Sequence, residues 1–347
     1  MNTEIIKVSA SDGAEKYEKA VKLLKSDNVV GMPTETVYGL AGNALSELSV
    51  KRIFEAKGRP QDNPLIVHIS EFSEIYELVS EVPEIAKKLA KKFWPGPLTM
   101  ILPKSEIVPM CVTAGLNSVA VRCPSHIVAR NLIKYSGLPI AAPSANISGK
   151  PSPTKAEHVI EDLFGKVDVI IDGGPCNVGV ESTIVTLATD PPVLLRPGAV
   201  TLETLTSLLG HVQISRTILS EMNDDEIAAA PGMKYKHYAP INPVTLIIGS
   251  DKKVITYINK RCETENLAIL CYDEDVPYIT DCRNIFTIGK ANDPMQQARS
   301  IFDALRATDE CSFITGVIAR CPESKDGVNL AVYNRLLKAS GFNVIKL

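Results

Sequence analysis

The chain has 347 residues and a formal net charge of −3, with 45% hydrophobic and 22% charged residues. This composition is ordinary for a globular protein and excludes disordered, collagen-like and coiled-coil chains, while the length suits two domains or one large one. Neither half of the chain is a basic nucleic-acid-binding tail. The first residues carry charges throughout without the apolar region of a signal peptide, and no run of about 18 apolar residues occurs. We therefore expect a cytoplasmic protein that does not contact membranes.

The first part of the chain alternates helical and strand patterns. Apolar residues at helical spacing predict helices over Tyr17–Leu24 and Val50–Phe54, and the second helix should end at Gly58. Thr154 and Glu157 have the spacing of a capping box and predict a helix that reaches residue 163. Further helices are expected over 72–80 and 83–93, and strands over 29–32, 64–69, 98–102, 118–122, 138–142, 167–171, 183–187 and 193–195. Residues 1–210 are thus predicted to form one mixed α/β domain.

A linker and a second, smaller domain are expected after this region. Residues 211–240 include a polar stretch and a segment without apolar periodicity, so we predict a linker there. A new alternation then fills residues 241–347, with strands over 244–248, 267–272, 285–288 and 313–319 and helices over 252–261, 294–306 and 328–340. This order predicts a small open α/β sheet.

The eight cysteines form no Cys-x-x-Cys pair, and the closest two, Cys262 and Cys271, are nine positions apart. Zinc sites, iron–sulfur clusters and redox dithiols use closer pairs. We expect reduced thiols with mostly structural roles.

Two segments of the first domain are rich in groups that bind anions. Lys57 and Arg59 flank Gly58 at a predicted exposed turn, where both cations could reach one phosphate, although cations also favour helix ends for electrostatic reasons alone. Residues 139–152 lead from an apolar strand into a loop of hydroxyl and amide side chains, which is typical of ligand-binding loops and also of plain turns. His68 lies in an apolar strand, where a buried core histidine is the ordinary interpretation.

Several common active-site motifs are missing from the sequence. Gly149-Lys150 is followed by proline, so no phosphate-binding P-loop exists, and no Gly-x-Gly-x-x-Gly opens a helix. Ser144 lacks the flanks of a hydrolase nucleophile, and the histidines show no zinc-protease spacing. P-loop, standard dinucleotide, serine-hydrolase and zinc-protease sites are therefore not expected.

Six motifs in order along the chain resemble the YrdC-type domain of the threonylcarbamoyl-AMP synthase family. They are Pro-Thr-Glu-Thr-Val-Tyr-Gly-Leu at 33–40, Lys-Gly-Arg-Pro at 57–60 with Asn-Pro-Leu at 63–65, Trp-Pro-Gly-Pro-Leu-Thr at 94–99, Pro-Ser-Ala-Asn at 143–146 with Ser-Gly at 148–149, Glu-Ser-Thr at 181–183, and Leu-Arg-Pro-Gly at 195–198. The segment 230–240 is similar to the joint of the two-domain form, whose second domain is Rossmann-like. The resemblance implies a mixed twisted-sheet domain, a linker and a small Rossmann-like domain.

The resemblance also implies a reaction. L-threonine, bicarbonate and ATP would give threonylcarbamoyl-AMP and pyrophosphate, with Mg²⁺ bound through the ATP phosphates rather than by protein ligands. A partner transferase would then move the threonylcarbamoyl group to tRNA as N6-threonylcarbamoyladenosine, and direct tRNA contact is expected to be at most weak.

Site residues follow from the same resemblance. The central tetrad around the triphosphate would be Lys57, Arg59, Ser144 and Asn146. Further ATP contacts would come from Asn63, Ser118, Ser152 and Arg196, with Tyr235 and His237 closing the pocket as a lid from the linker. The threonine end would be lined by Thr36, His68, Arg122, Ala142 and Ser182. Relatives often have a hydroxyl residue where this chain has Ala142, so a contact there would be through the backbone.

Two other functions compete with this one. A double-stranded RNA- or tRNA-binding module without catalysis is the alternative, but the net charge and the lack of a basic stripe interleaved with aromatic residues disfavour it. An O-carbamoyltransferase of the hydrogenase-maturation kind would carry paired Cys-x-x-Cys zinc motifs, which this chain lacks.

Overall fold

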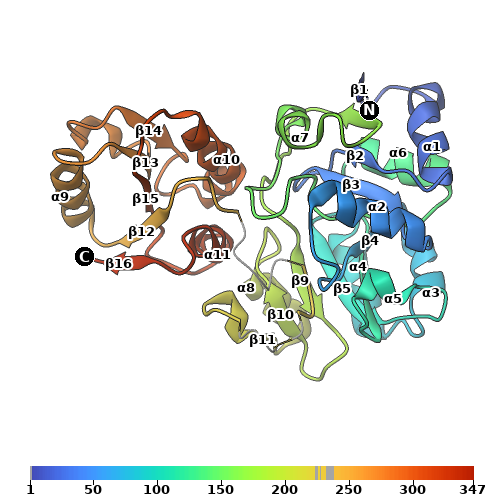
Figure 1. Cartoon of the computed structure of the whole chain (residues 1–347). Helices are drawn as coiled ribbons and strands as arrows, with labels where there is room; N and C mark the ends of the chain where they lie inside the picture. Colours follow the sequence, from blue (N-terminus) through green and yellow to red (C-terminus); the bar gives the residue numbers. More distant parts are fainter. Residues whose placement is uncertain (1, 223–225, 227, 232–237) are drawn as a thin grey trace.

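The structure, a computed structural model, describes residues 2–222, 226, 228–231 and 238–347. Figure 1 shows two α/β units side by side, one built from the N-terminal part of the chain and one from the C-terminal part. All eight cysteines are free. Within the described residues, the structure contains no helix long and apolar enough to cross a membrane.

The first unit is built on one long mixed sheet. Its strands lie in the order β1 (Glu4–Lys7), β8 (Val169–Asp172), β2 (Val30–Met32), β3 (Gly39–Asn43), β7 (Ile140–Ala141), β4 (Ile66–His68), β6 (Ser118–Arg122), β5 (Leu98–Pro103), β9 (Thr183–Thr186), β10 (Val193–Arg196) and β11 (Gln213–Ile214). The sheet contains both parallel and antiparallel pairs: β4 and β6 are parallel, whereas β5 and β6 are antiparallel. The predicted mixed α/β sheet is confirmed, and β11 falls within the residues predicted as linker.

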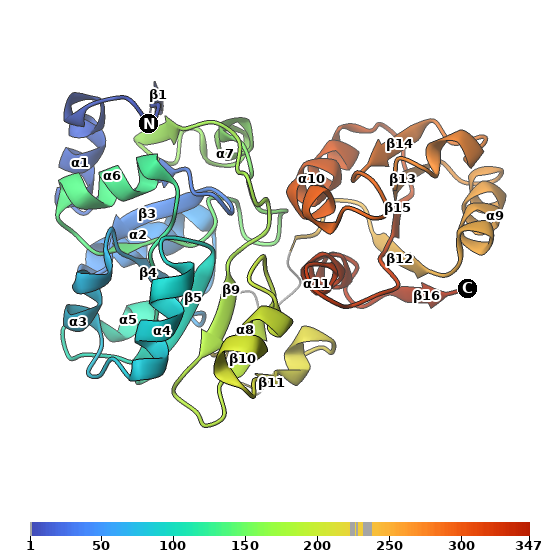
Figure 2. The ribbon, with the colours of Figure 1, turned by 180° about the vertical axis from the view of Figure 1, so that it is seen from behind.

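Helices cover both faces of this sheet, because successive strand residues point to opposite sides. The helices are α1 (Glu18–Lys25), α2 (Glu47–Lys57), α3 (Ile75–Leu78), α4 (Glu84–Phe93), α5 (Met110–Thr113), α6 (Ile127–Ser136), α7 (Ala156–Leu163) and α8 (Leu202–Leu209). On β8, Ile170 packs with the cluster of α2, α4 and α7, while Val169 and Ile171 pack with α1 and α6. Figure 2 shows α1 and α6 next to each other on their face.

Most predicted elements of this unit are confirmed, with two differences at helices. The predicted helix after Thr154 exists as α7, but the capping box is wrong, because Lys155 occupies the N-cap position without a side-chain bond. Thr154 instead donates its backbone N–H to Nδ1 of His158 at 3.2 Å. Helices α5, α6 and α8 were not predicted, although α6 ends at Gly137 in the left-handed conformation that is common after a helix.

The second unit is a parallel sheet between two layers of helices. Its strands lie in the order β14 (Asn284–Thr287), β13 (Leu267–Cys271), β15 (Gly316–Arg320), β12 (Val244–Ile248) and β16 (Val344–Lys346). Helix α9 (Asp251–Cys262) packs on one face. Helices α10 (Pro294–Ala307) and α11 (Asn329–Ala339) cover the other. The Rossmann-like architecture is confirmed, and β16 extends the sheet beyond the predicted strands.

The two units share a packed interface. Helices α10 and α11 are the elements of the second unit that face the first (Figure 1), and Val37 and Val180 of the first unit belong to their apolar cluster. Arg306 of α10 pairs with Asp162 of α7 at 2.7 Å, and Lys155 pairs with Asp303 at 2.8 Å. The second unit therefore packs directly against the loops that end the strands of the first.

Candidate active site

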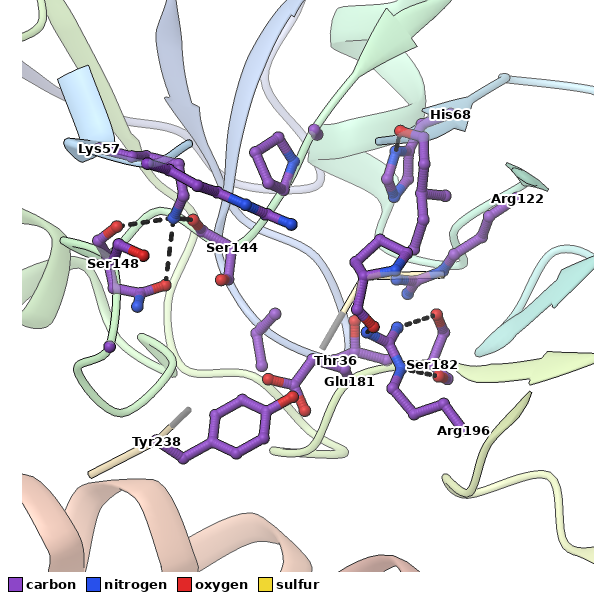
Figure 3. Close-up of a pocket in the computed structure, with 18 residues that line it drawn as sticks. Thr36, Lys57, His68, Arg122, Ser144, Ser148, Glu181, Ser182, Arg196 and Tyr238 are labelled. Atoms are coloured by element: carbon purple, nitrogen blue, oxygen red, sulfur yellow. Dashed lines mark hydrogen bonds between the residues drawn. The ribbon is translucent and has the colours of Figure 1, made fainter. Parts of the chain in front are cut away.

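A pocket lies in the first unit, where its strand-end loops meet Pro231 and Tyr238, which precede the second unit. Residues of the predicted site that line it are Thr36, Lys57, Arg59, His68, Arg122, Ala142, Ser144, Asn146, Ser182 and Arg196. Figure 3 shows Lys57 and Ser144 toward one end of the pocket and His68 and Arg122 toward the other.

The remaining predicted residues lie elsewhere. Asn63 is fully buried in the loop that follows Arg59. Ser118 begins β6 and Arg122 ends it, so the two are about 13 Å apart along the strand. Ser152 donates a short hydrogen bond to the Glu181 carboxylate, which itself lines the pocket. Tyr235 and His237, the predicted lid residues, lie outside the described residues.

Lys57 clamps the loop after β7. Its Nζ donates to the backbone oxygen of Ser144 and, at 2.6 Å, to that of Asn146. The predicted exposed position is wrong: Lys57 is only 2% exposed. The reason is helical periodicity, since Lys57 follows Val50 by seven residues and continues the buried stripe of α2. Burial, with Arg59 nearby, holds the pKa of Lys57 well below its usual value.

The loop from Pro143 to Gly149 is fixed at several points. Ser148 donates its backbone N–H to the Lys57 carbonyl at 3.0 Å, and Asn146 Nδ2 donates to the carbonyls of Ile147 and Lys150, both at 2.9 Å. Ser148 and Gly149 also line the pocket, although they were not predicted as site residues. This end of the pocket combines the N–H donors of Lys57 and Arg59 with a rigid polar loop, which suits a phosphate chain.

The opposite end is polar and deeply buried. Arg122, 3% exposed, places Nη2 at 2.7 Å from Glu35 Oε1 and donates Nε to the Gly96 carbonyl at 3.4 Å. Burial by itself would raise the pKa of Glu35, but the Arg122 guanidinium holds it below its usual value, so this pair is ionised. Arg122 also lines the pocket, where its guanidinium can bind a carboxylate ligand.

Neutral hydrogen-bonding groups accompany Arg122. Burial and the nearby Arg122 charge lower the pKa of His68 to about 3, so its imidazole is neutral. Nδ1 of His68 lies 3.1 Å from the Ile66 carbonyl and must therefore carry the proton. The Ser182 hydroxyl lies 2.8 Å from Thr99 Oγ1. The backbone N–H of Ala142 donates to the Ile66 carbonyl, so the group that Ala142 can offer to a ligand is its own carbonyl. This end suits a small polar molecule with a carboxylate and a hydroxyl.

Arg196 connects Ser182 to the segment that precedes the second unit. Its Nε donates to the Ser182 carbonyl at 2.9 Å, Nη2 to Ser182 Oγ at 3.1 Å and Nη1 to the Pro231 carbonyl at 3.2 Å. Burial lowers its pKa to about 10, so it keeps its charge at neutral pH. Pro231 and Tyr238, at the two edges of the undescribed segment, both line the pocket.

Glu181 is the most informative residue that sequence reasoning missed. The Glu-Ser-Thr motif contained it, but only Ser182 was assigned a role. Glu181 is 6% exposed and sits between Ser152 and Arg335 of α11. Its partner lies 154 residues further along the chain, so no local pattern reveals the pair.

Comparisons with known proteins agree with this architecture. The Sua5/YciO/YrdC family model, described as "Telomere recombination", matches residues 22–198, and the model "Threonylcarbamoyl-AMP synthase, C-terminal domain" matches residues 200–341. The chain is 47% identical to a threonylcarbamoyl-AMP synthase of Pyrococcus abyssi, over 99% of this chain and 100% of the relative. It is 46% identical to one of Bacillus subtilis, over 94% of each.

A solved structure supports the same assignment. The crystal structure of Pyrococcus abyssi Sua5 complexed with L-threonine matches with a TM-score of 0.92 at 46% identity, covering 99% of this chain and 100% of that one. Both sequence and structure thus agree over both units. The chain belongs to the threonylcarbamoyl-AMP synthase family of nucleotidyltransferases, in its two-domain form.

Proposed function

We propose that this chain makes threonylcarbamoyl-AMP and pyrophosphate from L-threonine, bicarbonate and ATP. The observation that carries the proposal is one pocket with two chemically different ends. Lys57 and Arg59 line one end, and Arg122 with neutral His68 lines the other. We place the triphosphate at the first end and threonine at the second. The relative from Pyrococcus abyssi has been solved in complex with L-threonine, which supports threonine as a substrate.

The proposed reaction has two steps. The neutral amine of threonine attacks bicarbonate to give a carbamate and water. A carbamate oxygen then attacks the α-phosphorus of ATP, the bond to the bridging oxygen breaks, and pyrophosphate leaves. Lys57 and Arg59 offset the charge that develops on the phosphates, while Arg122 orients threonine through its carboxylate.

Mg²⁺ fits this site as a companion of the nucleotide. Among the described residues there is no group of three or more His, Cys, Asp or Glu side chains that could hold a metal ion. Mg²⁺ prefers phosphate and water oxygens, and the Ser144 and Asn146 side chains offer neutral oxygens beside them. When bound, the ion neutralises phosphate charge; the residues of the pocket position the nucleotide around it.

We further propose that the product passes to a tRNA threonylcarbamoyltransferase in the cytoplasm, for N6-threonylcarbamoyladenosine formation. A threonylcarbamoyl adenylate is a mixed anhydride and needs a nucleophile such as the exocyclic amine of adenosine to accept its acyl group. Direct tRNA contact is expected to be weak, because the chain carries a net charge of −3.

The experiment that tests the function is mass analysis after incubation with ATP, Mg²⁺, L-threonine and ¹³C-labelled bicarbonate. The expected product is threonylcarbamoyl-AMP that carries the label, with pyrophosphate in equal amount, and omission of any substrate should abolish both. Salt-sensitive tRNA binding without pyrophosphate release would overturn the proposal in favour of the RNA-binding alternative.

A further inference from the structure

The pocket that we propose to bind anions also contains a carboxylate, that of Glu181. Glu181 lines the pocket together with Arg196 and Tyr238, and Figure 3 shows its carboxylate near the Tyr238 ring. Burial alone would raise its pKa, but Arg335 and then Arg196 hold the pKa below its usual value, so Glu181 is ionised. An unbalanced negative charge here would oppose the binding of a triphosphate.

The balancing charge comes from the other unit. Arg335, on α11, is fully buried at 0% exposed, and its Nε donates to Glu181 Oε2 at 2.7 Å. The other Glu181 oxygen accepts from Ser152. Both carboxylate oxygens are therefore held, one from the loop after β7 and one from the second unit.

Arg335 is itself fixed by several contacts. Nη1 donates to the Pro197 carbonyl at 3.0 Å and to Asn334 Oδ1 at 2.9 Å, and Nη2 donates to the Glu181 carbonyl at 3.4 Å. Its guanidinium also lies over the Tyr238 ring, 5.7 Å from the ring centroid. These contacts reach the backbone next to Ser182 and Arg196, two pocket residues. The planar guanidinium group of Arg335 has five N–H donors and can form all of these contacts at the same time, whereas a lysine ammonium group could not.

We propose that Arg335 is a positioning residue of the nucleotide site: it fixes the Glu181 carboxylate and cancels its charge, so that the pocket accepts a nucleoside triphosphate. The inference rests on the proposed function, because it assumes that the anion is ATP. The second unit then has a defined role, because Arg335 adds to Arg196 of the first unit the positive charge that balances Glu181.

The test measures binding of a non-hydrolysable ATP analogue to full-length variants by titration calorimetry. Arg335→Met should weaken binding about tenfold or more, because an uncompensated Glu181 charge then faces the phosphates. The double variant E181Q/R335M removes both charges, and we expect its affinity to return to within about threefold of the wild type. In steady-state kinetics, Arg335→Met should raise KM for ATP by a larger factor than KM for threonine.

Asp303→Asn is the matched control. It removes the ion pair of Asp303 with Lys155 and alters its contact with His158 across the same interface. Neither partner lines the pocket, so analogue binding should stay within about twofold of the wild type. Arg335→Met with wild-type affinity would overturn the proposal, as would a double variant that binds no better than Arg335→Met. A thermal melt shows whether Arg335→Met is folded. If it is not, analogue binding by the double variant tests the proposal: retained binding supports it, and a tenfold loss contradicts it.

This test is separate from that of the reaction. Analogue binding needs no product, so a wild-type chain that binds the analogue with this charge pattern, yet makes no threonylcarbamoyl-AMP, would contradict the proposed reaction and leave the role of Arg335 intact.

Discussion

Lys57 illustrates how one side chain serves both the fold and the site. Its ammonium group replaces solvent for the carbonyls of Ser144 and Asn146, and it also forms the pocket wall beside Arg59. Arg59 lies beyond the end of α2 and is partly exposed. The two cations are neighbours in sequence, but their substitution should have different consequences.

We expect Lys57→Met to lower both activity and stability. Two buried carbonyls would lose their donor, at a cost of about 1–3 kcal/mol in the free energy of unfolding. Arg59→Met should reduce pyrophosphate release by about 10²–10³-fold, as single electrostatic contacts in active sites do, with a smaller loss of stability. Urea unfolding and pyrophosphate assays on both variants measure the contrast. Equal stability losses, or near-normal activity in either variant, would contradict these roles.

His68 should make the fold sensitive to acid. Its folded pKa of about 3 lies below the unfolded value of about 6.5, so the unfolded state binds more protons between these pH values. The free energy of unfolding should therefore fall as pH drops through this range, and His68→Gln should show a shallower fall. Urea midpoints at about pH 7 and about pH 4.5 test this, with exposed His211→Gln as control. A wild-type-like slope in His68→Gln would show that His68 does not titrate as described.

At the scale of elements, helix α10 stabilises the loop after β7, which lines the proposed phosphate-binding end of the pocket. Arg306 donates to Asp162 of α7 and to the Pro151 carbonyl, both at 2.7 Å. Asp162 in turn accepts from the backbone N–H of Ile147 at 3.3 Å and pairs with Lys150 at 3.1 Å. The helix of the second unit is thereby connected to the loop that Lys57 clamps.

Arg306→Met should therefore destabilise the chain. Removal of one partner from a buried ion pair costs about 3–5 kcal/mol, and the lower end applies because Lys150 still pairs with Asp162. The measurement is the urea midpoint against the wild type. Arg299→Met, which removes a single hydrogen bond among the described residues, to the Asn177 carbonyl, serves as control and should cost less than about 1.5 kcal/mol. Equal losses in the two variants would show that Arg306 does not have this stabilising role.

Local patterns predicted the elements well where the periodicity was strong. The stripe over Val50–Phe54 and the stop at Gly58 reappear as α2 and its left-handed cap. Helix α8 (Leu202–Leu209) was missed because it adjoins the region without clear periodicity, and the predicted cap at Thr154 was wrong because α7 begins one residue later, with Lys155 at its N-cap. At the site, motif order located most of the pocket lining. The Glu181–Arg335 pair and the burial of Lys57 depend on how distant segments pack, which spacing along the chain does not encode.

At the scale of the molecule, the pocket belongs to both units. The first supplies the cations and the threonine end, and the second contributes Tyr238 and, through Arg335, the balance of charge. Tyr238 is held in the second unit by its ring contact with Phe302, at 5.1 Å between centroids. Separation of the two units should therefore alter the nucleotide site as well as the interface.

The central claim is that the two ends of one pocket bring a threonine-derived carbamate to the α-phosphorus of ATP. The most direct measurement follows ATP labelled separately at its α- and γ-phosphorus. We predict that the α label enters threonylcarbamoyl-AMP and the γ label enters pyrophosphate, only when threonine and bicarbonate are both present. Release of the γ label as orthophosphate, with the α label left in ADP, would place the attack at the wrong phosphorus and contradict the account.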